Sequence, residues 1–459
     1  MTPLVMDDVA APRKQAAPGK RVLFIAYQFP PVGGAGVQRA VKFVKYLPQF
    51  GWQPSVLTVA NPSVPVQDAS LASELPADAV VRRARTFEPS YAVKSTVIAA
   101  NERPGLRGRI KSLGRQVVNT LLQPDPQVLW LPAALRAGSA LLAETPHDAI
   151  VATGPPFSSF VLGAMLSRRS GLPLVLDYRD EWGLSNTYLE NKRVGRLARF
   201  VQERMQIDVV GQASALVATT RASAETLEEV RAQSGSTARV QWIYNGFDGA
   251  DFPAVSEVPG CVSPYYRLVY VGTLWNLTSP APLVRGVQRL AERSPALAAR
   301  LELVFAGRRT PSQQAVVDQL RQLPCRVVEH PYLNHEHALE LVRGADGLCV
   351  LLSDVPGAQR VVPAKLFEYF AARRPILAVA PPGECWKLLR DHPAVHLLEP
   401  GDPDSIALAL ADELRRDRPE DWRAWEGWNP ARFERRRQTG ELAALLDDLT
   451  PSSALRRAA

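Results

Sequence analysis

Short apolar runs rich in β-branched residues alternate with helical patterns along most of this chain. Such alternation is typical of βαβ units that build a parallel sheet. Each run has the length of one buried strand and is bounded by turn residues. The first half of the chain predicts six strands, at residues 21–26, 55–59, 149–152, 174–177, 215–219 and 240–244.

The alternation stops at residues 245–266, a stretch rich in Gly, Pro and Ser that is typical of an interdomain linker. It then restarts and predicts six more strands, at residues 268–272, 301–306, 326–328, 347–352, 376–379 and 395–398. We therefore expect an α/β protein of two Rossmann-like, doubly wound, parallel-sheet domains that face a central cleft. Ligands of such sheets bind beyond the carboxyl ends of the strands.

The predicted domain boundaries follow from these patterns. The N-terminal domain spans residues 21–247, the linker 248–266 and the C-terminal domain 267–415. Leucines at helical spacing predict a closing helical segment within residues 416–449. Residues 1–20 are expected to be a disordered leader, and residues 450–459 a frayed tail.

Composition narrows the class of protein. The chain has 459 residues, 46% of them hydrophobic and 22% charged, as in an ordinary globular protein. Its net charge of +8 favours an anionic partner such as a nucleotide, an acidic membrane or nucleic acid. Nucleic acid is the least expected of these, because the basic residues are not interleaved with aromatic ones. Four scattered cysteines and the lack of a long apolar run indicate a cytoplasmic protein with reduced thiols.

A glycine loop follows the first predicted strand. Gly33, Gly34 and Gly36 come after two prolines and before an amphipathic helix. Their spacing is not the G-x-G-x-x-G of a dinucleotide site, and residues 61–62 are Asn-Pro where a ribose-binding acid would be expected. The loop could be a tight connection, or it could allow a ligand to approach the backbone closely.

The segment "VVPAKLFEYFAARRPILAV" predicts a short helix before a strand. Pro363 suits the first helical turn, and Leu366 belongs to the apolar face. Lys365 and Glu368 lie three residues apart on one face. They could form an ion pair in water, or the helix start could hold a diphosphate while the carboxylate accepts hydrogen bonds from a ribose.

Other polar residues lie where strands end. Asp177, Arg179, Asp180 and Trp182 in "LVLDYRDEW" either form an acceptor or cleft site or satisfy one another within a turn. Ser158 could cap the next helix or touch a ligand. Asp402, in "PGDPDS", resembles part of a metal-binding motif, but the residues that follow favour a helix cap. No group of histidines has the spacing of a metal site, and we expect no metal.

Five motifs of the sequence together resemble the family 4 glycosyltransferases, which have the GT-B fold. They are "FIAYQFPPVGGAGVQR", "LVLDYRDEW", "IYNGFD", "YVGTL" and "VPAKLFEYFAARRPILAV". The resemblance runs from about Arg21 to the closing helix. It implies transfer of a sugar from a nucleotide-sugar donor with retention of anomeric configuration, without a metal or other cofactor. It also implies that the C-terminal domain holds the nucleotide and the N-terminal domain the acceptor.

The resemblance also assigns roles to residues. It implies that the glycine loop approaches the phosphates and sugar of the donor, and that Glu368 contacts the ribose. The donor-binding residues implied on the C-terminal domain are Gly272, Thr273, Pro363, Lys365, Leu366 and Glu368.

The chain departs from the family pattern at two points. Arg360 stands where the family has its first glutamate, which leaves the sugar contact to another residue such as Asp354. The segment "YVGTLWNLTSP" lacks the arginine and lysine that the family places there. Stabilising the leaving diphosphate without a metal requires cations or helix amides. The catalytic candidates are therefore Lys365, Arg308 and Arg360.

Three functions remain open on the sequence. The first is a glycosyltransferase of cell-surface polysaccharide or glycolipid synthesis, acting on a glycan or lipid-linked acceptor. The others are a nucleotide-sugar epimerase or hydrolase, and a catalytically silent nucleotide-sugar-binding subunit. Residues 103–122 place cations beside an apolar stripe, as in a surface helix or in an interfacial helix on an anionic membrane. The second interpretation predicts peripheral attachment to the inner face of the membrane.

Overall fold

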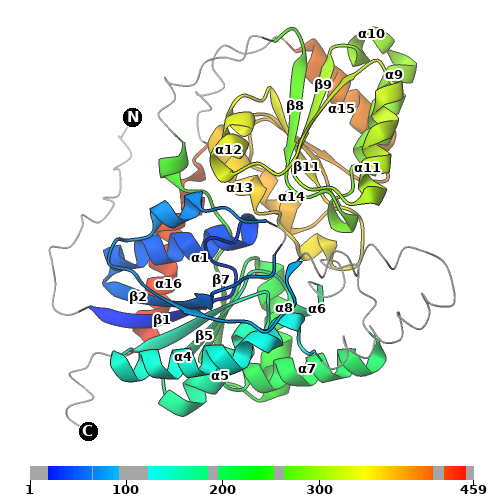
Figure 1. Cartoon of the computed structure of the whole chain (residues 1–459). Coiled ribbons are helices and arrows are strands. Elements are labelled where there is room, and N and C mark those ends of the chain that lie inside the picture. The colour runs from blue at the N-terminus through cyan, green and yellow to red at the C-terminus, as the bar shows by residue number, and fades with distance from the viewer. Residues whose placement is uncertain are drawn as a thin grey trace, which may run out of the picture.

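The structure, a computed structural model, describes residues 19–64, 66–91, 122–184, 195–252, 263–416 and 428–450. Within them the chain forms a seven-stranded sheet and a six-stranded sheet, both parallel. Figure 1 shows the two sheets in separate domains, each with helices packed beside it. The α/β, two-domain prediction is confirmed.

The N-terminal sheet has the strand order β3-β2-β1-β4-β5-β6-β7. Its central strands are mostly apolar because helices cover both faces; residues 22–26 of β1, for example, have no exposed surface. The strands are β1 Lys20–Ala26, β2 Trp52–Val59, β3 Val80–Ala84, β4 Ala149–Gly154, β5 Leu174–Tyr178, β6 Ala215–Ala218 and β7 Arg239–Trp242. The helices are α1 Ala35–Tyr46, α4 Leu131–Glu144, α5 Ser158–Ser170, α6 Trp182–Leu184, α7 Arg196–Val210 and α8 Arg221–Ser234.

The C-terminal sheet has the order β10-β9-β8-β11-β12-β13. Helices α9 and α15 pack closely on one side, where a Cβ at Gly286 would lie 2.2 Å from Ile406. The strands are β8 Tyr266–Val271, β9 Leu301–Ala306, β10 Arg326–His330, β11 Gly347–Leu351, β12 Ile376–Val379 and β13 Val395–Leu398. The helices are α9 Ala281–Arg293, α10 Pro295–Ala298, α11 Pro311–Asp318, α12 His335–Arg343, α13 Lys365–Ala372, α14 Glu384–Leu389 and α15 Pro403–Arg415.

Each of the twelve predicted strands is present, and one further strand, β3, was missed. Its sequence is VVRRA, its first residue Val80 is 47% exposed, and only Ala84 is buried. β3 lies at the edge of the sheet, paired to β2 alone. An edge strand facing water does not need an apolar run, so the pattern that reveals buried strands is absent here.

The closing helix α16, Arg435–Leu449, returns to the N-terminal domain. Leu442 and Leu446 share a core with Phe24 of β1 and Val41 of α1, and Figure 1 shows α16 beside these elements. The end of the chain therefore ties the two domains together. No helix in the described ranges has the length and apolarity needed to cross a bilayer.

The predicted boundary at residue 247 falls between the last strand of the first sheet and the first strand of the second. Of the predicted linker, residues 248–252 and 263–266 are described, and Gly249–Asp251 form the short 3-10 helix η6. The leader up to residue 18 and the tail from residue 451 lie outside the described residues.

Candidate active site

Lys365 begins α13 and lies against the turn that follows β8. Its Nζ is 3.6 Å from the ring centroid of Tyr270. A Cβ at Gly272 would lie 2.5 Å from this Nζ, and Gly272 has a φ of 141°, so the turn needs glycine on both grounds. Burial lowers the pKa of Lys365 to about 7. An amine that readily gains or loses a proton thus lies at the carboxyl edge of the sheet.

The turn after β9 packs against the same place. Gly307 has a φ of 135°, and a Cβ there would lie 2.3 Å from the carbonyl oxygen of Gly272. The next residue, Arg308, is exposed, whereas Arg309 is paired with Glu329 at 3.3 Å. Arg308 is therefore the arginine of this turn whose side chain is open to solvent near Gly272.

The other predicted donor-side residues of the C-terminal domain differ in what they expose. Thr273 is exposed, and its carbonyl oxygen accepts from Thr278 Oγ1 at 2.7 Å. Leu366 is fully buried in the domain core. Its backbone N–H donates to the carbonyl of Pro363 at 3.0 Å. Because the side chain of Leu366 is fully buried, it serves packing. Pro363 itself precedes α13, which begins two residues later than expected.

Glu368 lies on the same helical face as Lys365 but has different neighbours. Its carboxylate is 3.9 Å from Nδ1 of His335 on α12, and its side chain is 16% exposed. Burial raises the pKa of Glu368, and the positive charge of His335 opposes this shift. Lys365 and Glu368 therefore do not form the simple ion pair in water that was one interpretation of the sequence.

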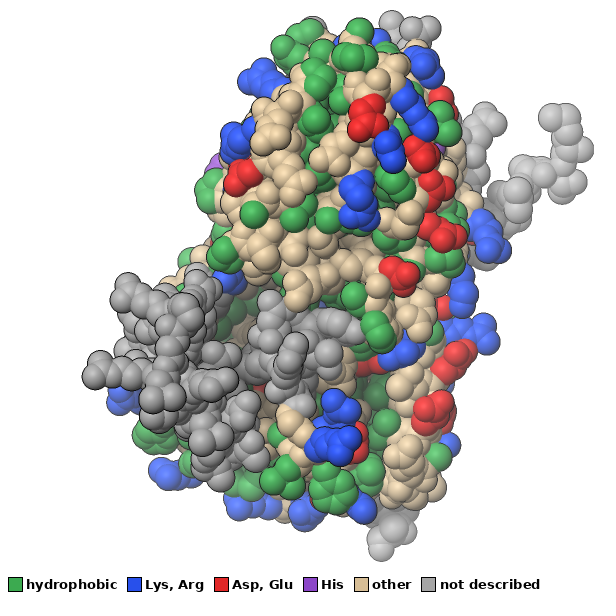
Figure 2. Space-filling model, turned by 90° about the vertical axis from the view of Figure 1, so that its right-hand side faces the viewer, with side chains coloured by type: hydrophobic (Ala, Val, Ile, Leu, Met, Phe, Trp, Pro, Cys, Tyr) green, Lys and Arg blue, Asp and Glu red, His purple; other side chains and the backbone are tan. Residues whose placement is uncertain are grey.

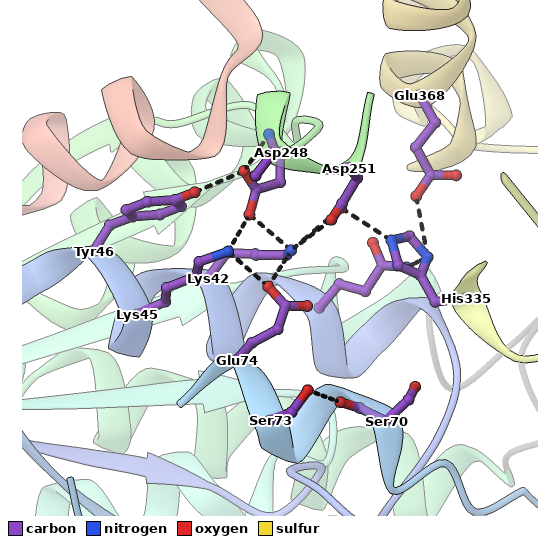
Figure 3. A network of polar contacts seen from close by, with 12 residues as sticks. Lys42, Lys45, Tyr46, Ser70, Ser73, Glu74, Asp248, Asp251, His335 and Glu368 are labelled. Atoms are coloured by element: carbon purple, nitrogen blue, oxygen red, sulfur yellow. Dashed lines mark hydrogen bonds and ion pairs between the residues drawn. The ribbon is translucent and has the colours of Figure 1, made fainter. Parts of the chain in front are cut away.

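A polar network joins Glu368 to the N-terminal domain, as Figure 3 shows. His335 contacts Gln38 of α1 through Nδ1 at 2.9 Å and Asp251 of η6 through Nε2 at 3.1 Å. Burial acts to lower the pKa of His335, but the hydrogen bond to Asp251 and the charge of Glu368 raise it overall. Asp251 in turn contacts Lys42 of α1 at 3.2 Å. The network thus links α1, the linker and α12.

Three carboxylates of this network, Glu74, Asp248 and Asp251, have oxygens within 4.8 Å of one another, close enough for a metal ion. However, Lys42 bonds to all three, and Lys45 bonds to Glu74 and Asp248 at 2.9 and 2.8 Å. The two ammonium groups already supply the positive charge that a metal would bring. The cluster is therefore an interdomain charge network.

The glycine loop meets the C-terminal domain. Gly34 has a φ of 101°, precedes α1, and donates its N–H to the hydroxyl of Tyr332 at 3.1 Å. A Cβ at Gly33 would lie 2.9 Å from the same hydroxyl, and one at Gly36 would lie 2.5 Å from Oε1 of Gln28. Backbone conformation therefore accounts for Gly34, and lack of space for a side chain accounts for Gly33 and Gly36.

Three of the predicted acceptor or cleft residues, on β5, α5 and α6, are buried in the N-terminal domain. Asp177 accepts three hydrogen bonds from Arg39, the shortest 2.8 Å, and both side chains are 1% exposed. Trp182 stacks on Phe157 with ring centroids 4.5 Å apart. Ser158 is fully buried as the first residue of α5, and its N–H donates to a carboxylate. These three side chains are buried, and Asp177 is satisfied by Arg39 of α1 rather than by its neighbours in the turn.

Arg179 and Asp180 lie differently. Arg179 donates to Gln28 at 3.0 Å, and a Cβ at Gly36 would lie 3.9 Å from its Nη2, so it is a neighbour of the glycine loop. Burial lowers the pKa of Arg179 to about 10. Asp180 is exposed; surrounding protein raises its pKa by partial desolvation, against the charge of Arg179.

Arg360 makes a forked ion pair across the domains. Its Nε and Nη2 donate to the two carboxylate oxygens of Glu181 at 2.8 and 2.7 Å. Its carbonyl accepts from Thr220 at 3.0 Å. The guanidinium is thus engaged by the N-terminal domain, and contact with a leaving diphosphate would require this pair to open. That predicted role stays a prediction.

The structure brings most of the predicted site residues to the facing edges of the two domains. Sequence reasoning missed their partners across the interface, because each is a single polar residue in a loop or on a helix surface. The sequence signal that could have found them is their position after a strand, because Tyr332 and His335 follow β10 and Glu181 follows β5. The missed residues are Gln38, Glu181, Tyr332 and His335.

Residues 33–246 match the family described as the glycosyl transferase 4-like domain. The chain carries a glycosyl transferase 4-like domain. With its two facing Rossmann-like domains it has the GT-B fold, and the matched domain is of the glycosyltransferase class. The predicted resemblance to the family 4 glycosyltransferases is confirmed. No curated protein sequence matches the chain significantly.

Solved structures of similar fold align with nearly the whole chain, including its glycosyl transferase 4-like domain. HepE from Anabaena, in complex with UDP and glucose, is 15% identical with a TM-score of 0.53, over 96% of this chain and 99% of that one. An α,α-trehalose-phosphate synthase (UDP-forming) from Burkholderia vietnamiensis is 13% identical with a TM-score of 0.54, over 94% and 97%. WaaG, a glycosyltransferase involved in lipopolysaccharide biosynthesis, is 14% identical with a TM-score of 0.54, over 94% and 100%.

Proposed function

We propose that this protein transfers a sugar from a nucleotide-sugar donor to a glycan or lipid-linked acceptor, with retention of anomeric configuration. The observation that carries the proposal is the contact of Lys365 with Gly272 at the start of α13. It places an amine and the first amides of a helix together at the carboxyl edge of the second sheet, where a diphosphate is favoured. Glu368, one turn further along α13, is the proposed acceptor of hydrogen bonds from the ribose hydroxyls.

The donor class proposed is a UDP-sugar. This rests on the GT-B structures of similar fold, of which HepE is described with UDP and glucose and the trehalose-phosphate synthase as UDP-forming. Lys365 and Arg308, together with helix amides, would stabilise the negative charge that develops as the diphosphate leaves. The reaction would then proceed without a metal, and EDTA would leave its rate unchanged.

A panel of UDP-, GDP- and ADP-sugars tests the proposal by thermal unfolding, followed by a transfer assay with the donor that binds. A donor at a hundredfold excess over its Kd should add about 2.7 kcal/mol to the free energy of unfolding. The stereochemistry of the transferred sugar, read by NMR, should match that of the donor. Donor binding with an inverted product would contradict retention.

A catalytically silent binding subunit is the second candidate, and the Arg360–Glu181 pair favours it. Arg360 stands at the position of the family's sugar-contacting glutamate and is held by the other domain. Donor binding without turnover on any glycan or lipid-linked acceptor would support this candidate. Transfer to one acceptor would exclude it.

We propose that the protein works on the cytoplasmic side of a membrane, in cell-surface polysaccharide or glycolipid synthesis. Residues 103–121, nearly all of the predicted interfacial segment, lie outside the described residues. The net charge of +8 supports the proposal, as do the basic side chains along the lower, N-terminal-domain edge in Figure 2. Each basic residue near an anionic leaflet contributes about 1 kcal/mol of attraction.

Sedimentation with lipid vesicles should therefore show binding to anionic vesicles, weakening as salt is raised, and none to neutral ones. Changing Arg107, Arg109 and Lys111 to Glu should reduce binding. The same change at three arginines outside that segment, Arg293, Arg321 and Arg415, is the control. Equal loss in the two triple variants would indicate a general charge effect, and no binding by the wild type at low salt would favour a soluble acceptor.

A further inference from the structure

One histidine lies among polar groups from three other elements where the two domains meet. His335, the first residue of α12, has a side chain that is 13% exposed. Its Nε2 donates to the carboxylate of Asp251 on η6 at 3.1 Å, and its Nδ1 lies 2.9 Å from Nε2 of Gln38 on α1. The same Nδ1 is 3.9 Å from Oε1 of Glu368 on α13 (Figure 3). This ring therefore contacts the linker and both domains.

Charged groups act on the ring from each side, and the negative ones prevail. Burial and the ammonium group of Lys42 on α1 disfavour the protonated ring. The hydrogen bond to Asp251 and the charge of Glu368 outweigh them, so the pKa of His335 is raised. The effect is mutual, because burial raises the pKa of Glu368 while the charges of His335 and of Arg435, on α16, oppose this shift. The histidine and the glutamate therefore each stabilise the charged form of the other.

The proton on the ring also decides which hydrogen bonds the ring makes. In the neutral ring Nε2 donates to Asp251 and Nδ1 is an acceptor, which suits the amide nitrogen of Gln38. In the charged ring both nitrogens donate, so Nδ1 needs an oxygen, and the carboxylate of Glu368 offers one. A hydrogen bond from Gln38 also acts to lower the pKa of Glu368. The proton of His335 and the amide of Gln38 thus act on the same carboxylate.

We propose that His335 is a positioning residue of the donor site, whose positive charge keeps the Glu368 carboxylate ionised for the ribose hydroxyls of a nucleotide. The ribose contact of Glu368 belongs to the proposed function, on which this inference rests. An ionised carboxylate accepts hydrogen bonds with both oxygens, whereas a protonated one carries a hydroxyl that must donate. The affinity for a ribose therefore falls as the pH falls and Glu368 gains a proton. His335 moves this fall to lower pH.

A titration of the ligand-free protein followed by NMR tests the pairing itself. The chain has six histidines, and with ¹³C-labelled rings each should give one signal between about pH 5 and pH 9. The signal of His335 is the one that a substitution at this position removes. We expect its midpoint to lie above the ordinary histidine value, and Glu368→Gln to lower it by about one pH unit. Glu336→Gln, at an exposed residue of α12, is the control and should move it far less. A midpoint that Glu368→Gln does not move would overturn the pairing.

The pH profile of uridine binding tests the role at the donor site. Uridine has a ribose but no phosphate, so the attraction between Lys365 and a diphosphate does not enter. Calorimetry should show a wild-type affinity that falls toward acid pH. In His335→Gln this fall should move to higher pH by about one unit, and the two affinities should converge at alkaline pH. An unmoved profile would overturn the role, and so would an equal loss at every pH, which a purely structural defect gives.

Two further variants separate charge from shape. His337→Gln removes an exposed histidine of the same helix and should keep the wild-type profile. His335→Lys keeps a positive charge at this position and should return the acid fall to its place in the wild type. A folded His335→Lys that behaves as His335→Gln does would count against the charge. If His335→Gln unfolds, the histidine titration of Glu368→Gln decides, because that variant leaves the ring in place.

The two experiments also distinguish this inference from the proposed function. Failure of uridine and of every nucleotide sugar to bind would overturn the proposed function, and with it the role of His335 at a ribose. Binding of a UDP-sugar together with a His335 midpoint that Glu368→Gln leaves unmoved would overturn the role of His335 and leave the proposed function intact.

Discussion

Lys365 and Glu368 lie one helical turn apart, and the fold shifts both toward their neutral forms. Burial lowers the pKa of the lysine to about 7 and raises that of the glutamate. Each shift reflects lost hydration of a charge. A ligand that brings a diphosphate to one and hydroxyl groups to the other would restore what burial removes, so both side chains are suited to a ligand that the free chain lacks.

Glu368→Gln should weaken the binding of UDP-glucose, taken here as a probe donor, by about 1–3 kcal/mol, the scale of a hydrogen bond to a charged group. The fold should remain intact, because the carboxylate is 3.9 Å from its nearest charged partner. Calorimetry measures the affinity, with the exposed Glu336→Gln as control. Unchanged affinity in Glu368→Gln would remove this residue from the donor site.

The lysine predicts a pH dependence. Below pH 7 Lys365 is protonated and should attract a diphosphate, and above pH 7 it becomes neutral. The affinity for UDP-glucose should therefore fall about tenfold between pH 6 and pH 8. Lys365→Met should bind more weakly at pH 6 and lose this dependence. Lys387→Met, at a side chain 67% exposed in the same domain, should keep it; a wild-type profile that is flat would contradict the assignment.

At the scale of elements, the turn after β8 decides where the lysine goes. Gly272 and Gly307 both have positive φ and pack against each other, and the space this leaves is filled by Lys365. The motif "YVGTL" contains the glycine of this turn. The side chain that leaves no room for a Cβ there is Lys365, on a helix that begins more than ninety residues later. A helix cap, in contrast, depends only on residues that are close in sequence. Asp402 accepts a hydrogen bond from the N–H of Ser405 at 3.0 Å, as four consecutive residues predict.

Gly272→Ala should displace Lys365, because the added Cβ would lie 2.5 Å from Nζ. We expect a loss of stability of about 1 kcal/mol or more from the positive φ and a clear loss of UDP-glucose affinity. Gly171→Ala has a positive φ of 72° but nothing within 4 Å of the new Cβ. It should lose stability by the same cause and keep its affinity. Urea unfolding and calorimetry give the two quantities, and equal loss of affinity in both variants would mean that strain alone acts.

At the scale of the whole molecule, contacts between the domains flank the donor-side residues. Arg360 pairs with Glu181 at one place, and His335 with Gln38 at another. Helix α16, which follows the C-terminal domain in sequence, packs on the N-terminal one. These contacts help to set the relative position of the two domains.

A double-mutant cycle on Arg360 and Glu181 measures one of these contacts. The coupling should be about 0.5–3 kcal/mol. Arg360→Ala should cost more than Glu181→Ala, because Glu181 is 9% exposed and Arg360 30%, so the stranded carboxylate is less hydrated. The exposed pair Arg221–Glu225, with side chains 66% and 68% exposed, should couple by about 0.5 kcal/mol or less. Thermal unfolding reports both cycles, and no coupling at Arg360 would show that the ion pair does not hold the domains.

The sequence by itself determined twelve of the described strands, the two-domain fold and the helix that carries Lys365 and Glu368. These follow from local signals, since a buried parallel strand must be apolar and a helix start needs certain residues. The edge strand β3 escaped because water, not the core, covers it.

The tertiary structure alone decided which polar groups meet. Asp177 and Arg179 are two residues apart in one motif, yet one is bound by Arg39 and the other donates to Gln28 beside the glycine loop. Arg360 pairs with a glutamate 179 residues away. A charge is satisfied by whatever lies within a few ångströms, and that distance is set by the packing of both domains rather than by neighbours in sequence.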